Sequence, residues 1–520
     1  MQYKLTPLPF AVGARVVTAA EMRRADAFAI DTLGVPGVVL MENAGRAAAV
    51  AAAEMVPPGA RVAVVCGAGN NGGDGFVVAR HLTSWGFVVD ILQGREDLAY
   101  RGDAEINRAI AARLLVPVRP AWTPERVAAL PGTGHYDLTV DAVLGTGLTG
   151  DVRGIAASLI HWIDQQGAPV LAVDIASGIC SDTGRVLGRA VRATRTVTFG
   201  ASKLGHWLHP GAAHTGTLEV IDIGIPEAAL AGAGERRVLG RADLTPAFQP
   251  RPLDAHKGVQ GHVGVLGGSV GRTGAARMAA DAALRAGAGL VSIATASEAL
   301  PALAGGLYEV MGEAIDARVP PADAARRLNA RDAVVIGPGI SVDAATGGWL
   351  AELLPRLTVP VVIDADGLNH LAAWPEVWRE APPRVLTPHP GEAARLLGTT
   401  TAAVQADRIG AVAALVERTG GVVVLKGAHT WVGAPDGTRC VCPAGNPGMA
   451  SAGMGDVLSG IIGALLARGL EPAQAAAAAV LWHARAGDLV AARGTENALV
   501  AGDVIGALAA VERGERCSGD

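Results

Sequence analysis

A glycine-rich segment with three polar side chains follows an apolar run near the start of the chain. It reads Gly67-Ala-Gly-Asn-Asn-Gly-Gly-Asp-Gly75 and comes directly after the apolar residues 62–66. Glycines at its first, third and sixth positions have the spacing of loops that hold pyrophosphate at a helix N-terminus. Asp74 does not fit such a loop, because a carboxylate stands where pyrophosphate should meet bare backbone N–H groups. The segment therefore predicts a dinucleotide-type pocket that does something other than hold a redox cofactor.

Two further loops in the first half carry acidic and hydroxyl side chains. One runs from Asp141 through Gly145-Thr-Gly-Leu-Thr-Gly150, and the other reads Asp174-Ile-Ala-Ser-Gly178. Each Asp alone is also explained as a helix cap or turn residue. Three acidic loops at three successive strand ends instead favour one shared pocket, whose carboxylate, amide and hydroxyl oxygens suit an alkali or alkaline-earth cation.

The second half contains a different arrangement of glycines and an acid. Gly448-Met-Ala-Ser-Ala-Gly-Met-Gly-Asp456 leads into the apolar helical run 457–466. Backbone N–H groups and the helix dipole at such a turn gather the charge that develops on a transferring phosphoryl group. A lone Gly-Asp pair is commonly a tight turn with an acidic cap, but the second glycine and the helix behind it favour a catalytic base at Asp456.

These loops require strands and helices that place them together. In the first half, apolar runs alternate with Ala-rich helical patterns at residues 62–66, 87–92, 138–143, 170–175, 196–199 and 218–223. The alternation restarts at residues 262–266, 290–294, 333–336, 359–364, 384–387, 422–425 and 430–432. This pattern is typical of parallel sheets covered by helices. We predict two α/β domains, residues 1–228 and 244–520, joined by a loop-rich linker at 229–243, with no repeat between them.

Composition excludes several classes of protein. The chain has 520 residues and a net charge of −5, which gives no long-range field suited to nucleic acid. No apolar stretch reaches the roughly 20 residues of a membrane span, and residues 1–18 lack the pattern of a secretory signal. The five cysteines form neither a disulfide framework nor a zinc motif. We therefore expect a cytoplasmic protein with reduced thiols and no nucleic-acid or membrane partner.

Four ordered motifs in the first half resemble the NAD(P)H-hydrate epimerase domain, over about residues 16–225. They are Gly69-Asn-Asn-Gly-Gly-Asp-Gly75, Asp141 with Gly145-Thr-Gly-Leu-Thr-Gly150, Val173-Asp-Ile-Ala-Ser-Gly178 and Thr198-Phe-Gly-Ala-Ser-Lys203. The chain departs from the family at Ala176 and Ser202, where the family usually has Pro. The resemblance implies a Rossmann-like three-layer α/β/α domain whose dinucleotide is the substrate.

The resemblance also implies roles for individual residues. The hydrated dinucleotide would be held by Asn70, Asn71, Gly72, Gly73, Asp74, Gly145, Thr146, Gly147, Leu148, Thr149, Gly150, Asp151 and Asp174. A potassium ion would be held by Asn71, Asp141 and Ser177.

The chemistry that the family implies is the loss and return of one hydroxyl group. In hydrated NAD(P)H, carbon C6 of the nicotinamide ring carries a hydroxyl next to nitrogen, and this hydroxyl leaves with help from the nitrogen lone pair and returns on the other face. One group must protonate the leaving oxygen and take a proton on return. We assign this role to Asp174, with Lys203 as a helper or positioning charge.

Seven ordered motifs in the second half resemble the ADP-dependent NAD(P)H-hydrate dehydratase domain, over about residues 244–510. Among them are Gly267-Gly-Ser269, Gly337-Pro-Gly339, Thr387-Pro-His-Pro-Gly-Glu392 and Lys426-Gly-Ala-His-Thr430, besides the turn before Asp456. The resemblance implies a ribokinase-like α/β fold. Substrate contacts would come from Ala275, Gly339, His389 and Asp456, and nucleotide contacts from Lys426, Gly427, Ala428, His429, Thr430 and Gly455.

Together the two resemblances imply a bifunctional repair enzyme. The first domain would interconvert the R and S forms of hydrated NADH or NADPH, and the second would dehydrate the S form with ADP and Mg²⁺, giving AMP and phosphate. One alternative is a small-molecule kinase for a vitamin or sugar. A second alternative, which can hold with or without the first, is that the first domain is a noncatalytic dinucleotide-binding module. We also expect a homo-oligomer.

Overall fold

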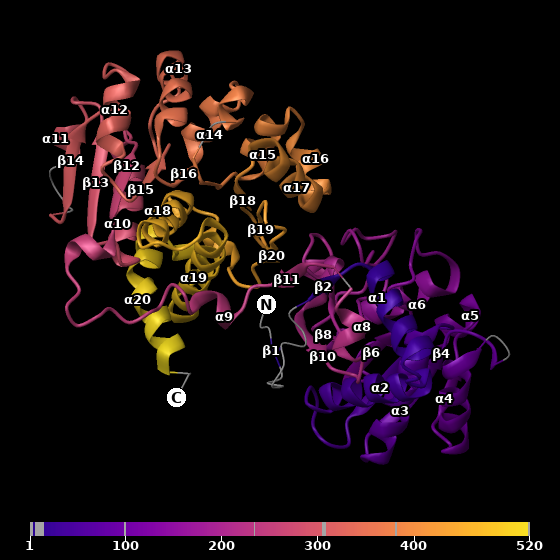
Figure 1. Ribbon diagram of the computed structural model, residues 1–520. Helices are drawn as coiled ribbons and strands as arrows, with labels where there is room; N and C mark the ends of the chain where they lie inside the picture. The colour runs from indigo at the N-terminus through magenta and orange to yellow at the C-terminus, as the bar shows by residue number, and fades with distance from the viewer. Residues whose placement is uncertain are drawn as a thin grey trace. The chain divides into compact units, whose positions relative to one another are not determined.

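The computed structural model describes residues 4–5, 15–97, 100–232, 234–303, 308–379 and 382–517. The chain divides into two compact units, Met1–Arg236 and Arg237–Asp520, each with its own sheet (Figure 1). The division falls inside residues 229–243, which were predicted as a linker. This region is not only loop, because it contains the end of α8 (Glu227–Leu230), β11 (Arg236–Val238) and the start of α9 (Arg241–Leu244).

The N-terminal unit is built on an eight-stranded parallel sheet in the order β1-β10-β8-β7-β6-β3-β4-β5. The strands are β1 (Lys4–Leu5), β3 (Arg61–Cys66), β4 (Val88–Gln93), β5 (Val118–Pro120), β6 (Leu138–Ala142), β7 (Val170–Val173), β8 (Arg195–Phe199) and β10 (Thr217–Ile221). A separate parallel pair joins β2 (Val16–Val17) to β9 (Ser202–Lys203). All six strands predicted for this half are present.

Helices cover both faces of this sheet. Alternate strand residues point to opposite faces, and apolar side chains on each face pack against helices. In β3, Val62 and Val64 pack in one buried cluster with residues of α2 and α3, whereas Ala63 and Val65 pack in another with residues of α6. The helices are α1 (Ala19–Ala27), η1 (Phe28–Thr32), α2 (Gly37–Ala53), α3 (Asn70–Ser84), α4 (Gly102–Arg113), α5 (Pro124–Ala128), α6 (Gly154–Gln165), η3 (Leu204–His206) and α7 (Ala212–Thr215). The predicted three-layer α/β/α architecture is confirmed.

The C-terminal unit has a ten-stranded sheet in the order β11-β20-β19-β18-β17-β16-β15-β12-β13-β14. The strands after β11 are β12 (His262–Leu266), β13 (Leu290–Thr295), β14 (Val310–Ala314), β15 (Ala333–Ile336), β16 (Val361–Ile363), β17 (Arg384–Leu386), β18 (Val422–Leu425), β19 (Trp431–Gly433) and β20 (Arg439–Val441). Pairing is parallel from β14 to β18 and antiparallel from β18 to β20.

The helices of this unit are α10 (Thr273–Arg285), α11 (Leu300–Leu303), α12 (Pro321–Leu328), α13 (Ala344–Leu353), α14 (Ala365–Leu371), α15 (Pro390–Leu397), α16 (Thr401–Ala406), α17 (Arg408–Thr419), α18 (Met454–Ala467), α19 (Pro472–Arg493) and α20 (Ala501–Cys517). Short 3₁₀ segments are η4 (Lys257–Gln260), η5 (Leu354–Arg356), η6 (Pro375–Arg379), η7 (Pro447–Met449) and η8 (Glu496–Ala498).

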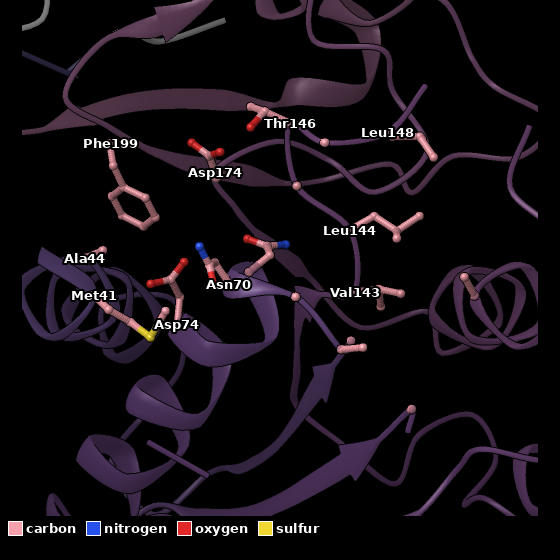
Figure 2. Close-up of a pocket in the computed structure, with 18 of the residues that line it drawn as sticks. Met41, Ala44, Asn70, Asp74, Val143, Leu144, Thr146, Leu148, Asp174 and Phe199 are labelled. Carbon is pink, nitrogen blue, oxygen red and sulfur yellow. The ribbon is translucent and has the colours of Figure 1, made fainter. Parts of the chain in front are cut away.

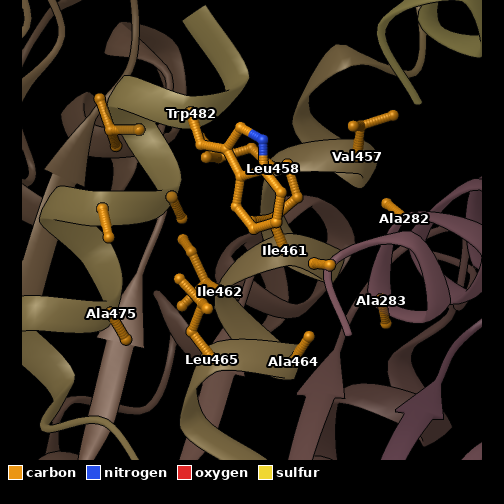
Figure 3. Close-up of a cluster of buried hydrophobic side chains, with 14 of the residues drawn as sticks. Ala282, Ala283, Val457, Leu458, Ile461, Ile462, Ala464, Leu465, Ala475 and Trp482 are labelled. Carbon is orange, nitrogen blue, oxygen red and sulfur yellow. The ribbon is translucent and has the colours of Figure 1, made fainter. Parts of the chain in front are cut away.

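The core of the C-terminal unit is centred on α18, which is buried along nearly its whole length. Figure 3 shows Trp482 of α19 beside Leu458 and Ile461 of α18. The Trp482 indole N–H donates to the backbone oxygen of Leu508 at 3.0 Å, so its one polar atom has a partner inside the core. This packing holds the N-terminal end of α18, and with it Asp456, in a defined position.

The structure shows the state of four cysteines and the apolar length of the described helices. Cys66, Cys440 and Cys442 are buried free thiols, and Cys180 is a partly buried one. Over the part of the chain that the structure describes, no helix is long and apolar enough to cross a membrane. In the same residues, no three His, Cys, Asp or Glu side chains gather as metal ligands.

Candidate active sites

The strand order of the N-terminal unit reverses between β3 and β6, and the loops after these strands open a cavity there. Parallel sheets bind ligands at such points, beyond the carboxyl ends of the strands. The cavity has a volume of about 1030 Å³ and is also lined by α1 and α2. In Figure 2, Asp74, Asp174, Phe199 and Met41 surround one end, and Leu144 and Leu148 lie towards the other.

Most of the residues predicted for the first site meet in this cavity. Its lining includes Asn70, Asn71, Asp74, Gly145, Thr146, Gly147, Leu148, Thr149, Gly150, Asp151, Asp174 and Lys203. Gly72 and Gly73 lie behind it in the first turn of α3, where added Cβ atoms would lie 2.0 Å from the Gly67 oxygen and 2.7 Å from the Met41 Cε. These two glycines allow close packing under the loop.

Lys203 and Asp174 form a buried ion pair at the acidic end of the cavity. The Lys203 Nζ donates to Asp174 Oδ1 at 2.5 Å, to Thr198 Oγ1 at 2.7 Å and to the Phe199 oxygen at 3.2 Å. Thr198 Oγ1 donates to the same Asp174 oxygen at 2.9 Å. Burial alone would raise the pKa of Asp174, but the Lys203 charge and these hydrogen bonds lower it below the usual value. Asp174 is therefore held in its ionised form.

His206 supports the backbone that carries Asp174. Asp174 has a φ of 66°, in the left-handed region that side chains other than glycine rarely adopt. The Lys203 backbone N–H donates to His206 Nδ1 at 3.1 Å. The proton of the neutral ring is therefore on Nε2, which donates to the Asp174 backbone oxygen at 3.1 Å. Burial, with a further contribution from Lys203, lowers the pKa of His206 to about 3, so the ring stays neutral. The sequence analysis did not single out His206 or Thr198.

Two more carboxyl groups face the same ion pair. Burial raises the pKa of Asp74 well above its usual value, and the Asp174 charge raises it further. Asp26, on α1, lines the cavity too, and burial raises its pKa to about 6. One ammonium group thus stands among three carboxyl groups. The sequence analysis missed Asp26, although its place four residues after the buried Met22 puts it on the inward face of α1.

Of the three residues predicted to bind potassium, Asp141 and Ser177 are hydrogen-bonded to each other, and Asn71 lies against Gly145 in the loop after β6. Asp141 is fully buried and accepts hydrogen bonds from the Ser177 N–H at 2.8 Å and the Ser177 hydroxyl at 2.6 Å. The Asn71 amide is buried, and neither its oxygen nor its nitrogen has a partner in the described residues. Burial raises the pKa of Asp141 to about 6. A buried carboxylate beside an unsatisfied amide oxygen is a donor set that fits a cation.

In the C-terminal unit, Asp456 lies in the first turn of α18, after Gly453 with a φ of 90°. Lys426 donates to Asp364 Oδ1 at 2.7 Å and lies 3.8 Å from Glu392 Oε2. An added Cβ on Gly455 would lie 3.0 Å from the Lys426 Nζ. Burial, and next the Asp364 charge, raise the pKa of Asp456 to about 7. The arrangement is an acidic cluster with one lysine at a helix N-terminus.

The predicted nucleotide segment, residues 426–430, is the turn between β18 and β19. Gly427 has a φ of 134° and His429 a φ of 52°, so the backbone turns sharply there. Arg408 Nη2 donates to the oxygens of Leu425 and Lys426, both at 3.1 Å, and so holds the start of the turn. Lys426 is thereby positioned next to Gly455, and both were predicted to contact nucleotide.

The remaining predicted substrate residues are Gly339 after β15, Ala275 in the first turn of α10 and His389 after β17. Gly339 and Ala275 are adjacent, because an added Cβ on Gly339 would lie 3.4 Å from the Ala275 Cβ. His389 caps α15, accepting from the Gly391 N–H at 3.0 Å, and its Nε2 lies 3.4 Å from Glu392 Oε1. A second cavity of about 590 Å³ opens beside the Gly339 loop, where Arg272 and Ile340 line it.

Comparisons with known proteins find relatives of both units. A family model described as YjeF-related protein N-terminus matches residues 37–205, and one described as NAD(P)H-hydrate dehydratase matches residues 263–507. The bifunctional NAD(P)H-hydrate repair enzyme Nnr of Moorella thermoacetica is 43% identical over 518 residues, covering 96% of each chain. Its namesake in Escherichia coli is 38% identical over 504 residues, covering 96% of this chain and 94% of the relative.

Among solved structures, an ADP/ATP-dependent NAD(P)H-hydrate dehydratase from Bacillus subtilis is 27% identical. It covers 54% of this chain and 99% of that chain, with a TM-score of 0.47. The two family models fall in the two structural units, and the curated relatives extend over both. The chain therefore belongs to the family of bifunctional NAD(P)H-hydrate repair enzymes.

Proposed function

We propose that the N-terminal unit interconverts the R and S forms of hydrated NADH and NADPH, and that the C-terminal unit dehydrates the S form with ADP. The observation that carries this proposal is that one chain holds two separate acid–base clusters, each in the unit that matches the corresponding family model. An isomerase site and a phosphoryl-transfer site in one chain suit the repair of both epimers.

In the epimerase site, the cavity offers different surroundings to the two ends of the substrate. Met41, Phe199 and Ile223 give an apolar wall near Asp174 that suits the nicotinamide ring. Arg95 and Arg153 line the cavity as well and offer positive charge to the pyrophosphate. When the C6 hydroxyl leaves, the ring nitrogen becomes positive. The ionised Asp174 stabilises this charge and accepts a proton from the water that returns.

Potassium is the cation that we propose for Asn71, Asp141 and Ser177. The fit rests on the buried Asp141 carboxylate and the unsatisfied Asn71 oxygen. A bound K⁺ would neutralise Asp141 and fix the loop after β6, which contributes residues to the cavity wall. We expect K⁺, compared with tetramethylammonium, to raise the melting temperature of the wild-type protein. Asp141→Asn should abolish this difference, whereas a K⁺ effect unchanged in Asp141→Asn would remove the assignment.

In the dehydratase site, we propose that Asp456 takes the proton of the C6 hydroxyl as that oxygen attacks the terminal phosphoryl group of ADP. AMP leaves, and the ring oxygen then carries phosphate, which departs more readily than hydroxide. Loss of a proton from C5 restores the ring double bond. Lys426 and the N–H groups at residues 453–455 stabilise the transferring phosphoryl group. A pKa of about 7 is suited to a base that works near neutral pH.

Mg²⁺ is the second ion that we propose, bound together with ADP. The Asp364 Oδ2 is buried and has no partner among the described residues, and it lies in a cluster with more carboxylates than cations. Asp364 would therefore hold the ion. Mg²⁺ supplies neutralising charge to the phosphates during transfer.

The second cavity gives the hydrated dinucleotide room beyond the reacting ring. It begins next to Gly339 and Ala275 and extends past the ends of β12 and β13. We propose that the part of the substrate remote from C6 lies there, near the exposed Arg272. A homo-oligomer, a cytoplasmic location, and domain limits at 228 and 244 stay predictions.

One experiment tests the whole proposal. The purified chain is incubated with mixed-epimer NADH hydrate and Mg²⁺, with and without ADP, while reduced nicotinamide is followed by absorbance and the epimers by chromatography. We expect faster epimer exchange without ADP, and full recovery of NADH with release of phosphate when ADP is present. Asp456→Asn should keep epimer exchange and lose recovery. A stable phosphorylated small molecule in place of inorganic phosphate would favour the kinase alternative.

A further inference from the structure

Two carboxyl groups that line the epimerase cavity, Asp26 and Asp103, have no role in the family motifs or in the assigned chemistry. Of these, Asp26 interacts electrostatically with Lys203 and Asp174. Asp26 lies in the last turn of α1, on the same helix face as Met22, and both residues line the cavity. The structure gives its side chain no hydrogen bond or ion pair within the residues it describes, although a polar group so placed normally has a partner. Its carboxyl group is therefore available to a ligand.

The other groups at this end of the cavity cannot donate a proton to a leaving hydroxyl. All three protons of the Lys203 ammonium are directed at Asp174, Thr198 and the Phe199 oxygen. Asp174 is held ionised by that ammonium, and His206 donates its only N–H proton to the Asp174 backbone. Asp74 is almost fully buried, and burial and the Asp174 charge raise its pKa well above the usual value, which makes it a poor proton donor.

We propose that Asp26 is the general acid of the epimerase reaction, working with Asp174 as the general base, an inference that rests on the proposed epimerase function. The carboxyl proton of Asp26 passes to the C6 hydroxyl, the C6–O bond breaks, and water departs. The nitrogen lone pair forms the C6=N1 bond at the same time. Water then adds to the other face of C6, the π electrons return to nitrogen, and the spare proton goes to Asp174.

One proton shared by Asp26 and Asp174 is enough for epimerisation in both directions, from R to S and from S to R. After the forward step Asp174 holds the proton and Asp26 is ionised. The Lys203 ammonium favours ionised Asp174, so the proton returns to Asp26 through water in the open cavity, and the site is reset. Two neighbouring carboxyl groups whose surroundings push their pKa values apart are a recurring form of acid–base pair.

The charges that face Asp26 come from several elements. Burial raises its pKa to about 6, Lys203 of β9 opposes the rise, and Asp174 adds to it. Asp74 of α3 also interacts with it. On its own helix, Arg23 lines the cavity and Glu21 pairs with Arg236, whereas Glu227 of the neighbouring α8 pairs with Arg15. Because the acid acts in its protonated form, we expect kcat/KM for epimerisation to fall as pH rises through about 6.

The test compares Asp26→Asn and Asp26→Glu with Asp31→Asn in the full-length chain. Asp31 is an exposed carboxylate in η1 that does not line the cavity, so it serves as the matched control. Epimer exchange of NADH hydrate is followed by chromatography without ADP between pH 5 and 8, and the spontaneous rate is subtracted. ADP-dependent dehydration of the S form by the same samples reports the amount of intact chain, because that site belongs to the other unit, and chemical denaturation reports whether the N-terminal unit is folded.

For Asp26→Asn we expect kcat for epimerisation to fall by about 10²–10³-fold, which is the usual contribution of a general acid. KM should change by less than about threefold, and the fall of kcat/KM above pH 6 should disappear. Asp26→Glu should recover part of the rate, and Asp31→Asn should match the wild type. Dehydration should be unchanged in all three.

The outcomes distinguish failure of the Asp26 assignment from failure of the proposed epimerase function. If Asp26→Asn keeps the wild-type kcat, or keeps the wild-type pH profile at a reduced rate, Asp26 is not the acid. A change in KM alone would also overturn the assignment. If the wild-type chain itself exchanges epimers no faster than the spontaneous reaction, the proposed epimerase function fails instead, whatever Asp26 does.

Discussion

At the scale of single residues, the ion pair between Lys203 and Asp174 combines a structural role with the catalytic role that we propose for Asp174. The Lys203 side chain is 1% exposed and that of Asp174 16% exposed, so water screens their attraction little. The left-handed backbone of Asp174 is held by His206 from one side and by the β8 strand from the other. Such local strain at a reacting group is maintained by its surroundings.

Replacing Lys203 with Met should therefore cost stability as well as epimerase activity. The variant leaves a buried carboxylate without its partner, which typically costs about 3–5 kcal/mol. We expect a loss of this order in chemical denaturation at pH 7. The double variant Lys203→Met with Asp174→Asn should recover part of it. A loss in the double variant equal to the sum of the losses in Lys203→Met and Asp174→Asn would show that Asp174 and Lys203 do not interact in the folded state.

The pH dependence of this contribution follows from the lowered pKa of Asp174. Because folding favours the ionised carboxylate, the stabilisation is complete above the unfolded pKa of about 3.9 and disappears as pH falls through the lower folded pKa. The difference in unfolding free energy between wild type and Lys203→Met should accordingly shrink in acid. A difference that stays constant down to pH 2 would contradict this explanation.

A second residue-scale prediction concerns Asp366 in the dehydratase site. As the proposed base, Asp456 must be ionised, so kcat/KM for dehydration should rise with pH through about 7. Burial and the Asp364 charge are the larger causes of the raised pKa of Asp456, and the Asp366 charge adds to them. Asp366→Asn should therefore move the rise to lower pH and leave the plateau rate unchanged. Glu352→Gln, an exposed change on α13, should leave the profile where it is.

At the scale of elements, the position of Asp456 depends on how closely α18 packs against α10. An added Cβ on Gly460 would lie 2.1 Å from the backbone oxygen of Ala279, which cannot move without displacing α10. Gly460 therefore permits the helices to touch backbone to backbone. Glycine has a poor helix propensity. It is suited to position 460 only because it has no side chain to collide with α10.

Gly460→Ala should destabilise the C-terminal unit by about 3 kcal/mol or more, since overpacking of this kind forces the backbone to shift. Gly506→Ala is the matched control, because Gly506 lies on the exposed face of α20 with nothing within 4 Å of an added Cβ. That change should be neutral or stabilise by up to about 1 kcal/mol. Denaturation followed by Trp fluorescence distinguishes the two, and equal effects would contradict the packing argument.

At the scale of the whole molecule, each unit has its own sheet and buried core. We therefore expect residues 1–236 and residues 232–520, expressed separately, to fold and to unfold cooperatively. The second fragment starts early enough to keep β11, whose neighbour Leu239 donates to the Val441 oxygen at 2.9 Å.

The separate fragments also test the division of labour. Fragment 232–520 with ADP should rapidly convert only the S half of a mixed-epimer hydrate preparation, and added fragment 1–236 should carry the reaction to completion. Complete conversion by fragment 232–520 alone, beyond spontaneous exchange, would contradict the proposed epimerase role. The readouts are NADH absorbance and chromatography of the remaining hydrate.

Prediction from sequence succeeded where the signal is local. Apolar runs and glycine spacing act over a few residues, so the central strands of both sheets and the loops at their ends were placed correctly, whereas the short strands β1 and β5 were not predicted. The edge strand β14 was missed, because Gly312 and Glu313 break its apolar pattern and its residues are only partly buried. The region around β11 was taken for loop because its prolines and glycines hide a strand of three residues.

By itself the sequence determined that the chain has two α/β units and that polar loops follow their strands. It also predicted that Asp174, Lys203 and Asp456 carry the chemistry expected of the family. Only the tertiary structure decided the charge state of each group, because burial and neighbouring charges set a pKa and both come from residues distant in the chain. Asp26 shows this best. On its helix it is one acid among several charged residues, and only folding brings it beside Lys203 and Asp174 in a shared cavity.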